Sequence, residues 1–332
     1  MTRVFTGESW LKRVRIPLLI YVVCLAGYMG ASSNRLAKAS NDNHYVYLAD
    51  CLLKGRLSLE GAPPHQNDWA QVVELTLKDG RKLRGSFLKT GAPNRFKTTH
   101  KERMTITPDQ IRERHEIYYV SFPWLPALLM LPFVAIFGLK FNDVVFTVVL
   151  AAFNPVLVYW VLRRLSALKL SARSLGEDLW LVLMFAFGTV YFYSSVMGQV
   201  WYTAHIIGVG ITCLYVLVAL EGKHPFWAGV CLGLGFLVRT PIPFIFPLVV
   251  GEILRRHLRD ENKNLSGDLN QLELWPKICS LWHRIQWRPT IRDGVWLSAP
   301  VIFVALVAFG ANYLRFDNPF EFGHTYLNVV WA

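Results

Sequence analysis

Apolar residues occur along this chain in eight long blocks, and a polar stretch from residue 32 to 117 separates the first block from the rest. A helix that crosses a bilayer needs ~20 predominantly apolar residues, because the hydrocarbon core is about 30 Å thick. The pattern therefore predicts an all-α, polytopic membrane protein with a long polar first loop. The blocks are residues 16–31, 118–138, 143–162, 179–197, 204–220, 226–238, 241–254 and 295–313.

The distribution of lysine and arginine predicts which loops face the cytoplasm. Short loops rich in these residues stay inside, whereas long loops are translocated regardless of charge. Basic residues precede the first block and gather again in the loops 163–173 and 255–293. The loop 198–203 has none, and the segment 312–332 has a single arginine. The N-terminus and the basic loops are therefore expected inside, and the polar first loop and the other two segments outside.

These assignments leave one apolar block too many. If blocks 118–138 and 143–162 both crossed, the basic loop that follows them would lie outside. Block 118–138 carries Pro123, Pro126 and Pro132, and proline removes a backbone donor and breaks a helix interior. Irregular backbone at membrane depth is tolerated only where it packs within protein or lines a cavity. We therefore expect a re-entrant or surface-lying segment there, and seven spans in all.

Composition and charge narrow the class of protein further. Hydrophobic residues make up 53% of the 332 residues, and the net charge is +12. The charge lies in loops between apolar blocks, without a basic stripe and interleaved aromatics, so no nucleic-acid partner is expected. The five cysteines show no metal-ligand spacing. The first block also fits a second interpretation, a cleaved signal peptide, because small residues follow its short apolar core.

The first loop, residues 32–117, predicts an extracytoplasmic segment with its own small elements. Apolar residues recur at helical spacing over 45–57, which indicates an amphipathic helix on the membrane surface that Gly55 ends. Two alternating runs, 72–77 and 82–87, flank an Asp-Gly pair, which predicts a β-hairpin. The segment 102–107 suggests another strand, and the rest of about 62–117 is expected to be loop.

Asp42 is the candidate catalytic residue, because it follows the first span almost directly. A carboxylate at the membrane–water boundary is able to act as a general base that takes a proton from an acceptor hydroxyl. The alternative is that Asp42 caps the helix that follows, since aspartate is a preferred N-cap residue. His44, two positions later, is included among the substrate-binding candidates.

Arg239 and His205 are candidate donor-binding residues at the outer ends of apolar blocks. Arg239 is expected outside, where the positive-inside rule does not explain it, and a guanidinium is able to hold a phosphate with two hydrogen bonds. The alternative is an arginine that reaches to lipid headgroups. His205 follows Gln199, Trp201 and Tyr202, which suggests a sugar contact beside an aromatic platform, although such aromatics are also usual at membrane interfaces.

The last outer segment, residues 312–324, mixes charged and aromatic side chains. Arg315, Glu321 and His324 are its substrate-binding candidates. This segment is either an ordered loop over a site or a solvated loop with interfacial aromatics. The sequence favours neither interpretation. No Walker loop, GxGxxG, HExxH or GxSxG motif occurs in a suitable context.

A first span, an aspartate soon after it and an amphipathic juxtamembrane helix together resemble the GT-C glycosyltransferases. The most similar branch is that of the protein O-mannosyltransferases and aminoarabinose transferases. Residues 34–57, NRLAKASNDNHYVYLADCLLKGRL, place Asp42 at the acidic position of the family's Asp-Glu pattern, and GFLVRTPIP places Arg239 at a basic position. The Pro-rich segment 121–132 resembles the segment before the family's second span, and 312–324 resembles the outer loop after its seventh span. The chain departs from the family at Asn43, where a second carboxylate is usual.

The resemblance implies a seven-span GT-C-like module divided into 1–31, 32–117 and 118–332. It implies an inverting transfer of a sugar from a polyprenyl-phosphate donor to a glycan, lipid or protein acceptor, in a bacterial cytoplasmic membrane with the N-terminus inside. By resemblance Asp42 is the base and Arg239 holds the donor phosphate. Whether Mg²⁺ or Mn²⁺ takes part is left open. Two other classes stay open as well: a transporter or flippase for lipid-linked sugars, and a non-catalytic scaffold subunit.

Overall fold

The computed structural model describes residues 10–88, 94–258 and 282–328. Most of the predicted basic loop 255–293, with Cys279, lies outside the described residues. The chain forms two compact units, which are described separately. Unit 1 contains Met1–Ala31, Val148–Ser195 and His205–Val304, and unit 2 contains Ser32–Thr147, Val196–Ala204 and Ala305–Ala332.

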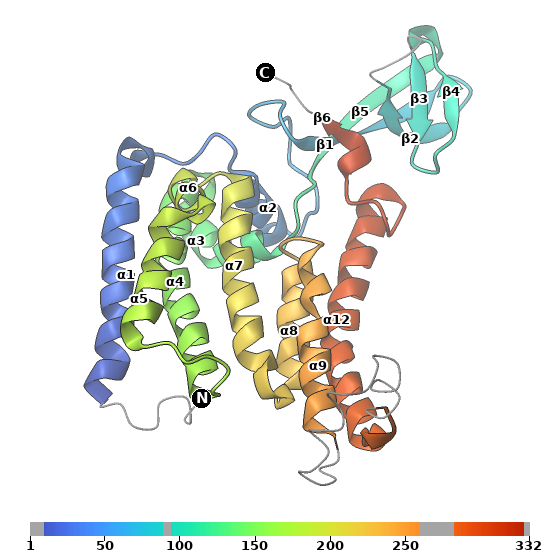
Figure 1. Cartoon of the computed structure of the whole chain (residues 1–332). Helices are drawn as coiled ribbons and strands as arrows, with labels where there is room; N and C mark the ends of the chain where they lie inside the picture. Colours follow the sequence, from blue (N-terminus) through green and yellow to red (C-terminus); the bar gives the residue numbers. More distant parts are fainter. Residues whose placement is uncertain (1–9, 89–93, 259–281, 329–332) are drawn as a thin grey trace. The chain divides into compact units, whose positions relative to one another are not determined.

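Helices make up most of the described chain (Figure 1). Among the described residues, α1 with η1, α4, α7 and α12 are each long and apolar enough to cross a membrane. Helices α5 and α6 pass the same test together, with a bend of 56° between them. The α-helices are α1 (Trp10–Ser32), α2 (His44–Leu53), α3 (Leu125–Phe137), α4 (Asp143–Ala167), α5 (Leu175–Gly188), α6 (Val190–Met197), α7 (Val200–Ala219), α8 (Pro225–Phe236), α9 (Pro247–Arg256) and α12 (Trp287–Phe316). The 3-10 helices are η1 (Ser33–Ala37), η2 (Pro108–Gln110), η3 (Gly138–Lys140), η4 (Leu220–Gly222), η5 (Ile242–Ile245) and η6 (His324–Tyr326).

These helices account for five of the seven predicted spans. The predicted spans 226–238 and 241–254 correspond to α8 and to η5 with α9. Helix α8 has 12 residues and α9 has 10, so each is shorter than a helix that crosses alone. The fold is that of a polytopic membrane protein, and the count of seven spans stays a prediction.

The sequence predicted that the Pro-rich block 118–138 is not an ordinary span, and in the structure this block is not one continuous helix. Its first three residues belong to strand β5, and helix α3 begins only at Leu125. Helix α3 has 13 residues and packs against α2 within unit 2. At 1.5 Å per residue it rises ~20 Å, which is less than the hydrocarbon thickness. This length agrees with a segment that does not cross fully, and its sidedness stays a prediction.

In unit 1, side chains pair the backbone groups that breaks in the apolar helices leave free. Helix α5 ends at Gly188, and the Thr189 hydroxyl donates to the Phe185 carbonyl at 2.9 Å. The Tyr28 hydroxyl of α1 donates to the Ala186 carbonyl at 3.1 Å. Such pairing is required where water is absent, because an unpaired backbone group in lipid costs several kcal/mol.

A proline inside α4 creates a similar need. Pro155 has no N–H group, so the carbonyl of Ala151, four residues earlier, lacks its usual helical donor. The Tyr191 hydroxyl of α6 donates to that carbonyl at 2.7 Å. Asn154 on the same helix donates to the Ile206 carbonyl of α7 at 2.7 Å. Polar side chains within these spans therefore join helices to one another.

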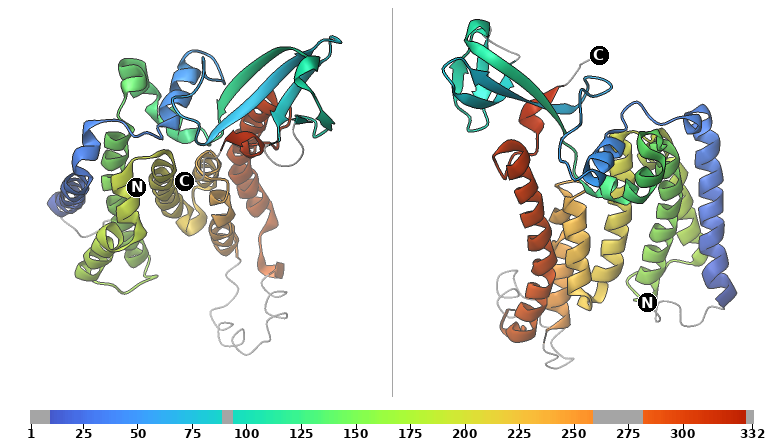
Figure 2. Two further views of the ribbon diagram at one scale, coloured as in Figure 1. Left: turned by 90° about the horizontal axis from the view of Figure 1, so that it is seen from above. Right: turned by 180° about the vertical axis from the view of Figure 1, so that it is seen from behind.

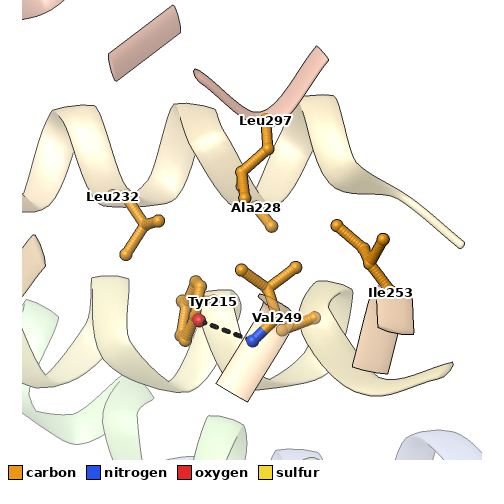
Figure 3. Close-up of a cluster of buried hydrophobic side chains, with 7 residues drawn as sticks. Tyr215, Ala228, Leu232, Val249, Ile253 and Leu297 are labelled. Atoms are coloured by element: carbon orange, nitrogen blue, oxygen red, sulfur yellow. Dashed lines mark hydrogen bonds between the residues drawn. The ribbon is translucent and has the colours of Figure 1, made fainter. Parts of the chain in front are cut away.

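Tyr215 of α7 holds the broken helix formed by η5 and α9 (Figure 3). Its hydroxyl donates to the Ile245 carbonyl at 2.9 Å and accepts from the Val249 N–H at 3.1 Å. These two backbone groups are four residues apart, so the hydroxyl takes the place of one helical hydrogen bond. Around this contact lies a core cluster of Tyr215, Ala219, Ala228, Leu232, Val249, Ile253 and Leu297.

Two glycines bring α8 and α12 into close contact. A Cβ atom added at Gly229 would lie 2.0 Å from the Leu297 carbonyl oxygen and 2.7 Å from a Pro300 ring carbon. One added at Gly233 would lie 3.1 Å from a methyl carbon of Val304. Small residues four apart are a common device for close packing of membrane helices, because the backbones approach where no side chain intervenes.

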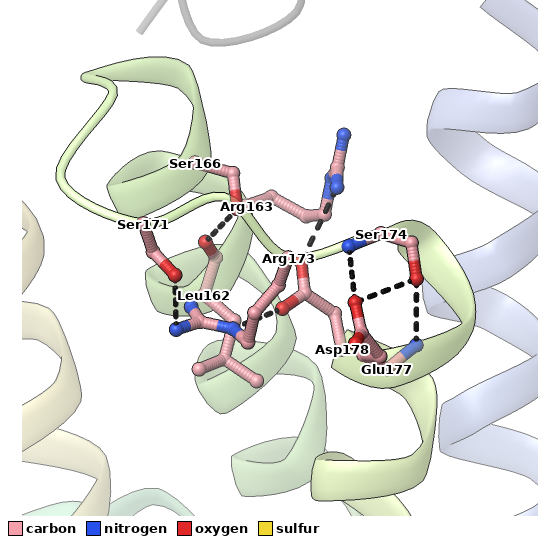
Figure 4. A network of polar contacts seen from close by, with 8 residues as sticks. All are labelled: Leu162, Arg163, Ser166, Ser171, Arg173, Ser174, Glu177 and Asp178. Carbon is pink, nitrogen blue, oxygen red and sulfur yellow. Dashed lines mark hydrogen bonds and ion pairs between the residues drawn. The ribbon is translucent and has the colours of Figure 1, made fainter.

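The turn between α4 and α5 is held by charged groups (Figure 4). Asp178 is fully buried and accepts hydrogen bonds from Arg163 at 3.2 Å and from Arg173 at 2.7 Å. Ser174 and Glu177 form a capping box at the start of α5. Two of the basic residues that the sequence places in this loop therefore neutralise a buried carboxylate.

Unit 2 contains an antiparallel β-sheet with strand order β4-β3-β2-β1-β5, and a short sixth strand pairs with β1 (Figures 1 and 2). The predicted hairpin is confirmed, because Val73 pairs with Gly85 and Thr76 with Lys82. The predicted third strand is present as β4. The strands are β1 (Trp69–Leu77), β2 (Lys82–Phe87), β3 (Arg95–Thr98), β4 (Arg103–Thr105), β5 (Ile111–Val120) and β6 (Leu327–Asn328).

The prediction that the rest of 62–117 is loop is wrong. Strand β5 pairs with β1 along almost its whole length, although residues 112–116 are all charged or histidine. Strand β6 returns from the last outer segment to pair with β1 at Trp69 and Ala70. The sheet therefore extends past the C-terminal end of the predicted insert, to Val120, and includes a strand from the last outer segment.

Helix α2 confirms the predicted juxtamembrane helix, with different bounds. It ends at Leu53, and Gly55 follows with φ +67°. The Gly55 N–H donates to the Leu52 carbonyl at 3.0 Å, and the Arg56 N–H to the Cys51 carbonyl at 2.9 Å. This is a Schellman motif, in which the left-handed residue is usually glycine.

Candidate functional site

The turn that carries Asp42 lies between η1 and α2 and is fixed by contacts from three segments of unit 2. The Ser40 N–H and hydroxyl donate to the Asp143 carboxylate at 2.8 and 2.5 Å. His65 Nε2 donates to the Asn41 carbonyl at 2.8 Å. The Val200 N–H donates to the Asp42 carbonyl at 3.1 Å. The backbone of the turn is therefore held in place around the half-buried Asp42 side chain.

The alternative role of Asp42 as a helix cap is wrong. The N-cap residue of α2 is Asn43, and its side chain makes no capping hydrogen bond. The Asp42 carboxylate therefore does not cap α2. Of the two roles that the sequence suggested for Asp42, helix cap and general base, the general base stays a hypothesis.

Asp143 anchors this turn from the start of α4. Its side chain is buried, with 2% of the residue exposed, and both carboxylate oxygens accept from Ser40. Asn142 caps the same helix by accepting from the Val144 N–H at 3.0 Å, and it donates to the Leu36 carbonyl at 2.9 Å. A buried carboxylate that receives two hydrogen bonds from one residue positions that residue firmly.

Asp68 is a second carboxylate of this region, and the sequence reasoning missed it. Burial, and next the negative charge of Asp42, raise the pKa of Asp68. A hydrogen bond from the Trp201 side chain and the charges of His65 and His324 lower it. Asp68 lies in the loop before β1, and its pKa is sensitive to the charge of Asp42. Its backbone is held in the left-handed region, φ +60°, by donation from its N–H to the Asn328 carbonyl at 2.7 Å.

His44 is part of the core beneath the Asp42 turn. It is 0% exposed, its ring stacks on Trp69 with 4.1 Å between centroids, and its Nε2 donates to the Asn67 carbonyl at 3.1 Å. Burial lowers the pKa of His44 to about 4, so the ring is neutral near pH 7. This burial does not support the predicted substrate contact and gives His44 a packing role.

The predicted aromatic platform lies at the start of α7. Gly198, with φ +68°, makes the turn into this helix, and a Cβ there would meet Val144 at 2.5 Å. The Gln199 carbonyl accepts from the Thr203 N–H at 2.9 Å, and Trp201 meets the edge of Phe122 with 6.4 Å between centroids. Gln199, Trp201 and Tyr202 are all partly exposed. Trp201 is the member of this group that the structure places beside a carboxylate, Asp68.

The last outer segment divides into a buried and an exposed part. Arg315 is 4% exposed, donates to the Val120 carbonyl at 2.9 Å and to the Asn312 side chain at 2.6 Å, and lies over the Trp124 ring. These contacts fasten the end of α12 to β5 and do not support a substrate contact. Glu321 accepts from the Gly323 N–H at 2.8 Å and shapes the following turn.

His324 lies in that turn and is exposed, so it stays a substrate-binding candidate. Its charge acts on Asp68. The segment is thus ordered, and it ends in the strand that pairs with β1. That it lies over a site stays a prediction.

Arg239 and His205 form a pair in unit 1, as their shared candidate role suggested. Arg239 Nη2 and His205 Nε2 are 2.9 Å apart. Arginine has no acceptor atom, so the guanidinium donates and His205 Nε2 accepts, which makes His205 the neutral tautomer protonated at Nδ1. Arg239 lies in the bend between α8 and η5, and its N–H donates to the Gly235 carbonyl at 2.9 Å. The imidazole therefore orients the guanidinium.

Metal binding has no preformed site in the part of the chain that the structure describes. No group of three histidine, cysteine, aspartate or glutamate side chains there has the arrangement of a metal site. Mg²⁺ prefers six oxygen ligands in octahedral geometry, and Asp42 and Asp68 are two carboxylates of this region.

Comparison with known proteins shows that part of the chain matches a family model. Residues 121–260, less than half of the chain, match the model of glycosyltransferase family 87. No curated protein and no solved structure matches the chain. The matched stretch includes Asp143, His205 and Arg239, whereas Asp42 and Asp68 precede it. The match supports a glycosyltransferase, and together with the apolar helices it suggests a membrane enzyme.

Proposed function

We propose that this chain is an inverting GT-C-type glycosyltransferase that moves a sugar from a polyprenyl-phosphate donor to an acceptor hydroxyl at the extracytoplasmic face of a bacterial cytoplasmic membrane. The observation that carries the proposal is the Asp42 turn, whose backbone is fixed from three segments while its carboxylate caps no helix. The family match to residues 121–260 supports the reaction class. The apolar helices support a lipid-borne donor.

In the proposed step the Asp42 carboxylate takes the proton of the acceptor hydroxyl. The acceptor oxygen attacks the anomeric carbon, and the bond from that carbon to the phosphate oxygen breaks. The polyprenyl phosphate leaves with the electron pair, and the anomeric configuration inverts. General-base catalysis of this kind contributes ~10²–10⁴-fold.

Arg239 is proposed to hold the donor phosphate through its remaining donors. One Nη2 hydrogen is engaged by His205, and a guanidinium has five N–H donors in a planar fork that matches a phosphate. A positive charge at the leaving phosphate stabilises the charge that grows there. His205 acts by orienting Arg239, because its Nε2 is an acceptor and would repel a phosphate oxygen.

The transporter alternative needs polar groups free to act at membrane depth. Three polar side chains within the described spans make helix–helix contacts: Asn154 with the Ile206 carbonyl, Thr147 with Thr203, and Tyr191 with the Ala151 carbonyl. This favours chemistry at a membrane surface over passage through the bundle. The scaffold alternative would give the β-sheet a docking role without transfer.

A transfer assay with a radiolabelled polyprenyl-phosphate sugar separates these classes. The purified chain in lipid nanodiscs is expected to release polyprenyl phosphate and to label an acceptor from a membrane extract. A transporter would move the donor across proteoliposomes without releasing the phosphate, and a scaffold would do neither. Absence of release over a panel of donor sugars would overturn the proposal.

The Asp143–Ser40 contact predicts a second, smaller effect on activity. Asp143→Asn and Ser40→Ala are each expected to lower kcat ~10-fold with little change in KM, because a misplaced general base acts less often on bound substrate. The double variant should be no worse than the worse single variant, since both break one contact. Asp50→Asn, which loses only an ion pair with Lys54 on α2, is the control. Additive losses would contradict a shared positioning role.

A further inference from the structure

The first two turns of α12 extend beyond its apolar part. The apolar block 295–313 rises ~28 Å at about 1.5 Å per residue, which matches a hydrocarbon core of about 30 Å. Residues 287–294 precede this block in the same helix. Lipid headgroups add about 5–8 Å on each side of the core. When the block spans the core, Arg292 lies ~4.5 Å and Arg288 ~10 Å beyond it, which brackets the depth of the headgroup phosphates.

Both arginines lie on the exposed side of α12. Arg288 and Arg292 are four residues apart, so they share one face of the helix, and both are exposed. Asp293, in contrast, is buried and lies 2.8 Å from His257 Nε2. Arg292 contacts Asp293 at 3.3 Å, but 66% of its side chain is exposed. Within the part of the chain that the structure describes, no ion pair involves Arg288. Both guanidinium groups are therefore accessible from the surroundings of the helix.

Tryptophan side chains flank these two arginines. Trp287 contacts Trp282 with 4.4 Å between ring centroids. Trp296 contacts Phe226 of α8 at 6.0 Å, and Phe226 contacts Trp227 at 5.5 Å. All four tryptophans are exposed. Tryptophan is enriched where a membrane protein meets the headgroup layer, because its ring is apolar and its N–H is polar. The aromatic side chains therefore indicate the same depth as the length of the helix does.

The start of α12 also has no acidic residue to balance its positive end. The first turn of a helix carries unpaired N–H groups and a partial positive charge, which favour an anion nearby. Neither α12 nor the adjacent α8 has an acidic side chain in its first turn. An external phosphate at this place would meet both the helix end and the guanidinium groups.

We propose that the start of α12 binds the phosphate of an anionic phospholipid through Arg288 and Arg292, with the tryptophan rings beside the glycerol and the upper acyl chains. This inference does not depend on the proposed glycosyl transfer. A lipid is favoured over a soluble anion because Ile291 and Val295, on the same side of the helix, are exposed and apolar. Acyl chains cover such residues, whereas a soluble anion makes no use of them. Guanidinium groups match phosphate oxygens in geometry and charge.

Native mass spectrometry of the full chain, released from detergent micelles, measures this binding with phosphatidylglycerol and phosphatidylcholine as competing probes. The unmodified chain is expected to retain phosphatidylglycerol in preference to phosphatidylcholine. Arg288→Gln should weaken phosphatidylglycerol binding ~5-fold and Arg288→Gln/Arg292→Gln ~25-fold, because a basic residue near a lipid surface contributes about 1 kcal/mol. Arg288→Lys should retain most of the binding, since the charge remains.

Lys169→Gln is the matched control. Lys169 belongs to the same unit, is exposed, and makes no ion pair among the described residues. The substitution removes one positive charge from another basic loop and should leave phosphatidylglycerol binding unchanged. Thermal unfolding in phosphatidylcholine nanodiscs should be the same for Arg288→Gln, Lys169→Gln and the unmodified chain, because exposed side chains without such contacts contribute little to stability.

Four results would overturn the inference. Equal retention of the two lipids would show that the headgroup charge is not recognised. Unchanged phosphatidylglycerol binding in Arg288→Gln/Arg292→Gln would exclude the two arginines. Equal weakening in Arg288→Gln and Lys169→Gln would reduce the effect to net charge. Displacement of phosphatidylglycerol by an equal concentration of glycerol 3-phosphate would identify a site for a soluble anion instead.

Discussion

Asp42→Asn is expected to lower kcat for sugar transfer ~10²–10⁴-fold, the contribution typical of a general base. The amide has the shape of the carboxylate and cannot take the acceptor proton. The contacts that fix the turn come from Ser40, from the Asn41 carbonyl and from the Asp42 carbonyl, so the substitution leaves them in place. The measurement is release of polyprenyl phosphate from a radiolabelled donor, with thermal unfolding in nanodiscs as the check on folding.

Asp68→Asn is the matched comparison for this result. It removes a carboxylate whose pKa is raised by burial and next by the charge of Asp42. We expect a smaller loss than in Asp42→Asn, because Asp68 is held by Trp201 and by backbone contacts of β6. Retained transfer in Asp42→Asn together with full loss in Asp68→Asn would assign the base to Asp68 instead.

Local sequence signals predicted the elements that local contacts create. The Asp-Gly pair between two alternating runs gave the β1–β2 hairpin, since the turn type alone sets that register. Gly55 marked the end of α2 because only a left-handed residue completes that cap. Arg239 and His205 were both singled out as outer-end polar residues, and the structure places them 2.9 Å apart.

Long-range pairing explains what the sequence did not reveal. Residues 112–116 of β5 show no alternation of apolar and polar types, and they form a strand because β1 offers a free edge. Asp68 follows a polar loop, and its backbone N–H donates to the carbonyl of Asn328, which is 260 positions away in the sequence. The burial of His44 and Arg315 likewise depends on the sheet. Candidates chosen by residue type near a span end could not distinguish these packed side chains from exposed ones.

The breaks in the apolar helices could not be predicted from hydropathy either. A hydropathy block is read as one span, although α5 and α6 bend at Thr189 and α9 follows a short 3-10 turn. These irregular helices persist because Tyr28, Tyr191 and Tyr215 pair the exposed backbone groups. A tyrosine hydroxyl and the carbonyl it satisfies lie far apart in the sequence, so no local pattern announces the pairing.

Gly229→Ala is expected to cause the largest loss of stability among single-methyl substitutions in the α8–α12 interface. The new Cβ would lie 2.0 Å from the Leu297 carbonyl oxygen, and a backbone atom cannot move aside as a flexible side chain does. The two helices must separate, which also loosens the cluster around Ala228 and Leu232. Overpacking of this kind costs about 1–3 kcal/mol and sometimes more. Thermal unfolding in nanodiscs, followed by size-exclusion chromatography, measures the loss.

Gly251→Ala makes the same chemical change in α9, where nothing lies within 4 Å of the added carbon. Alanine is a better helix former than glycine by about 1 kcal/mol, so this variant should unfold at the same or a higher temperature. The pair therefore separates helix propensity from steric contact, because propensity acts in the same direction at both sites. If Gly229→Ala were as stable as Gly251→Ala, the close approach of α8 and α12 would not be a feature of the folded protein. If both were destabilised equally, the loss would come from something other than the contact with Leu297.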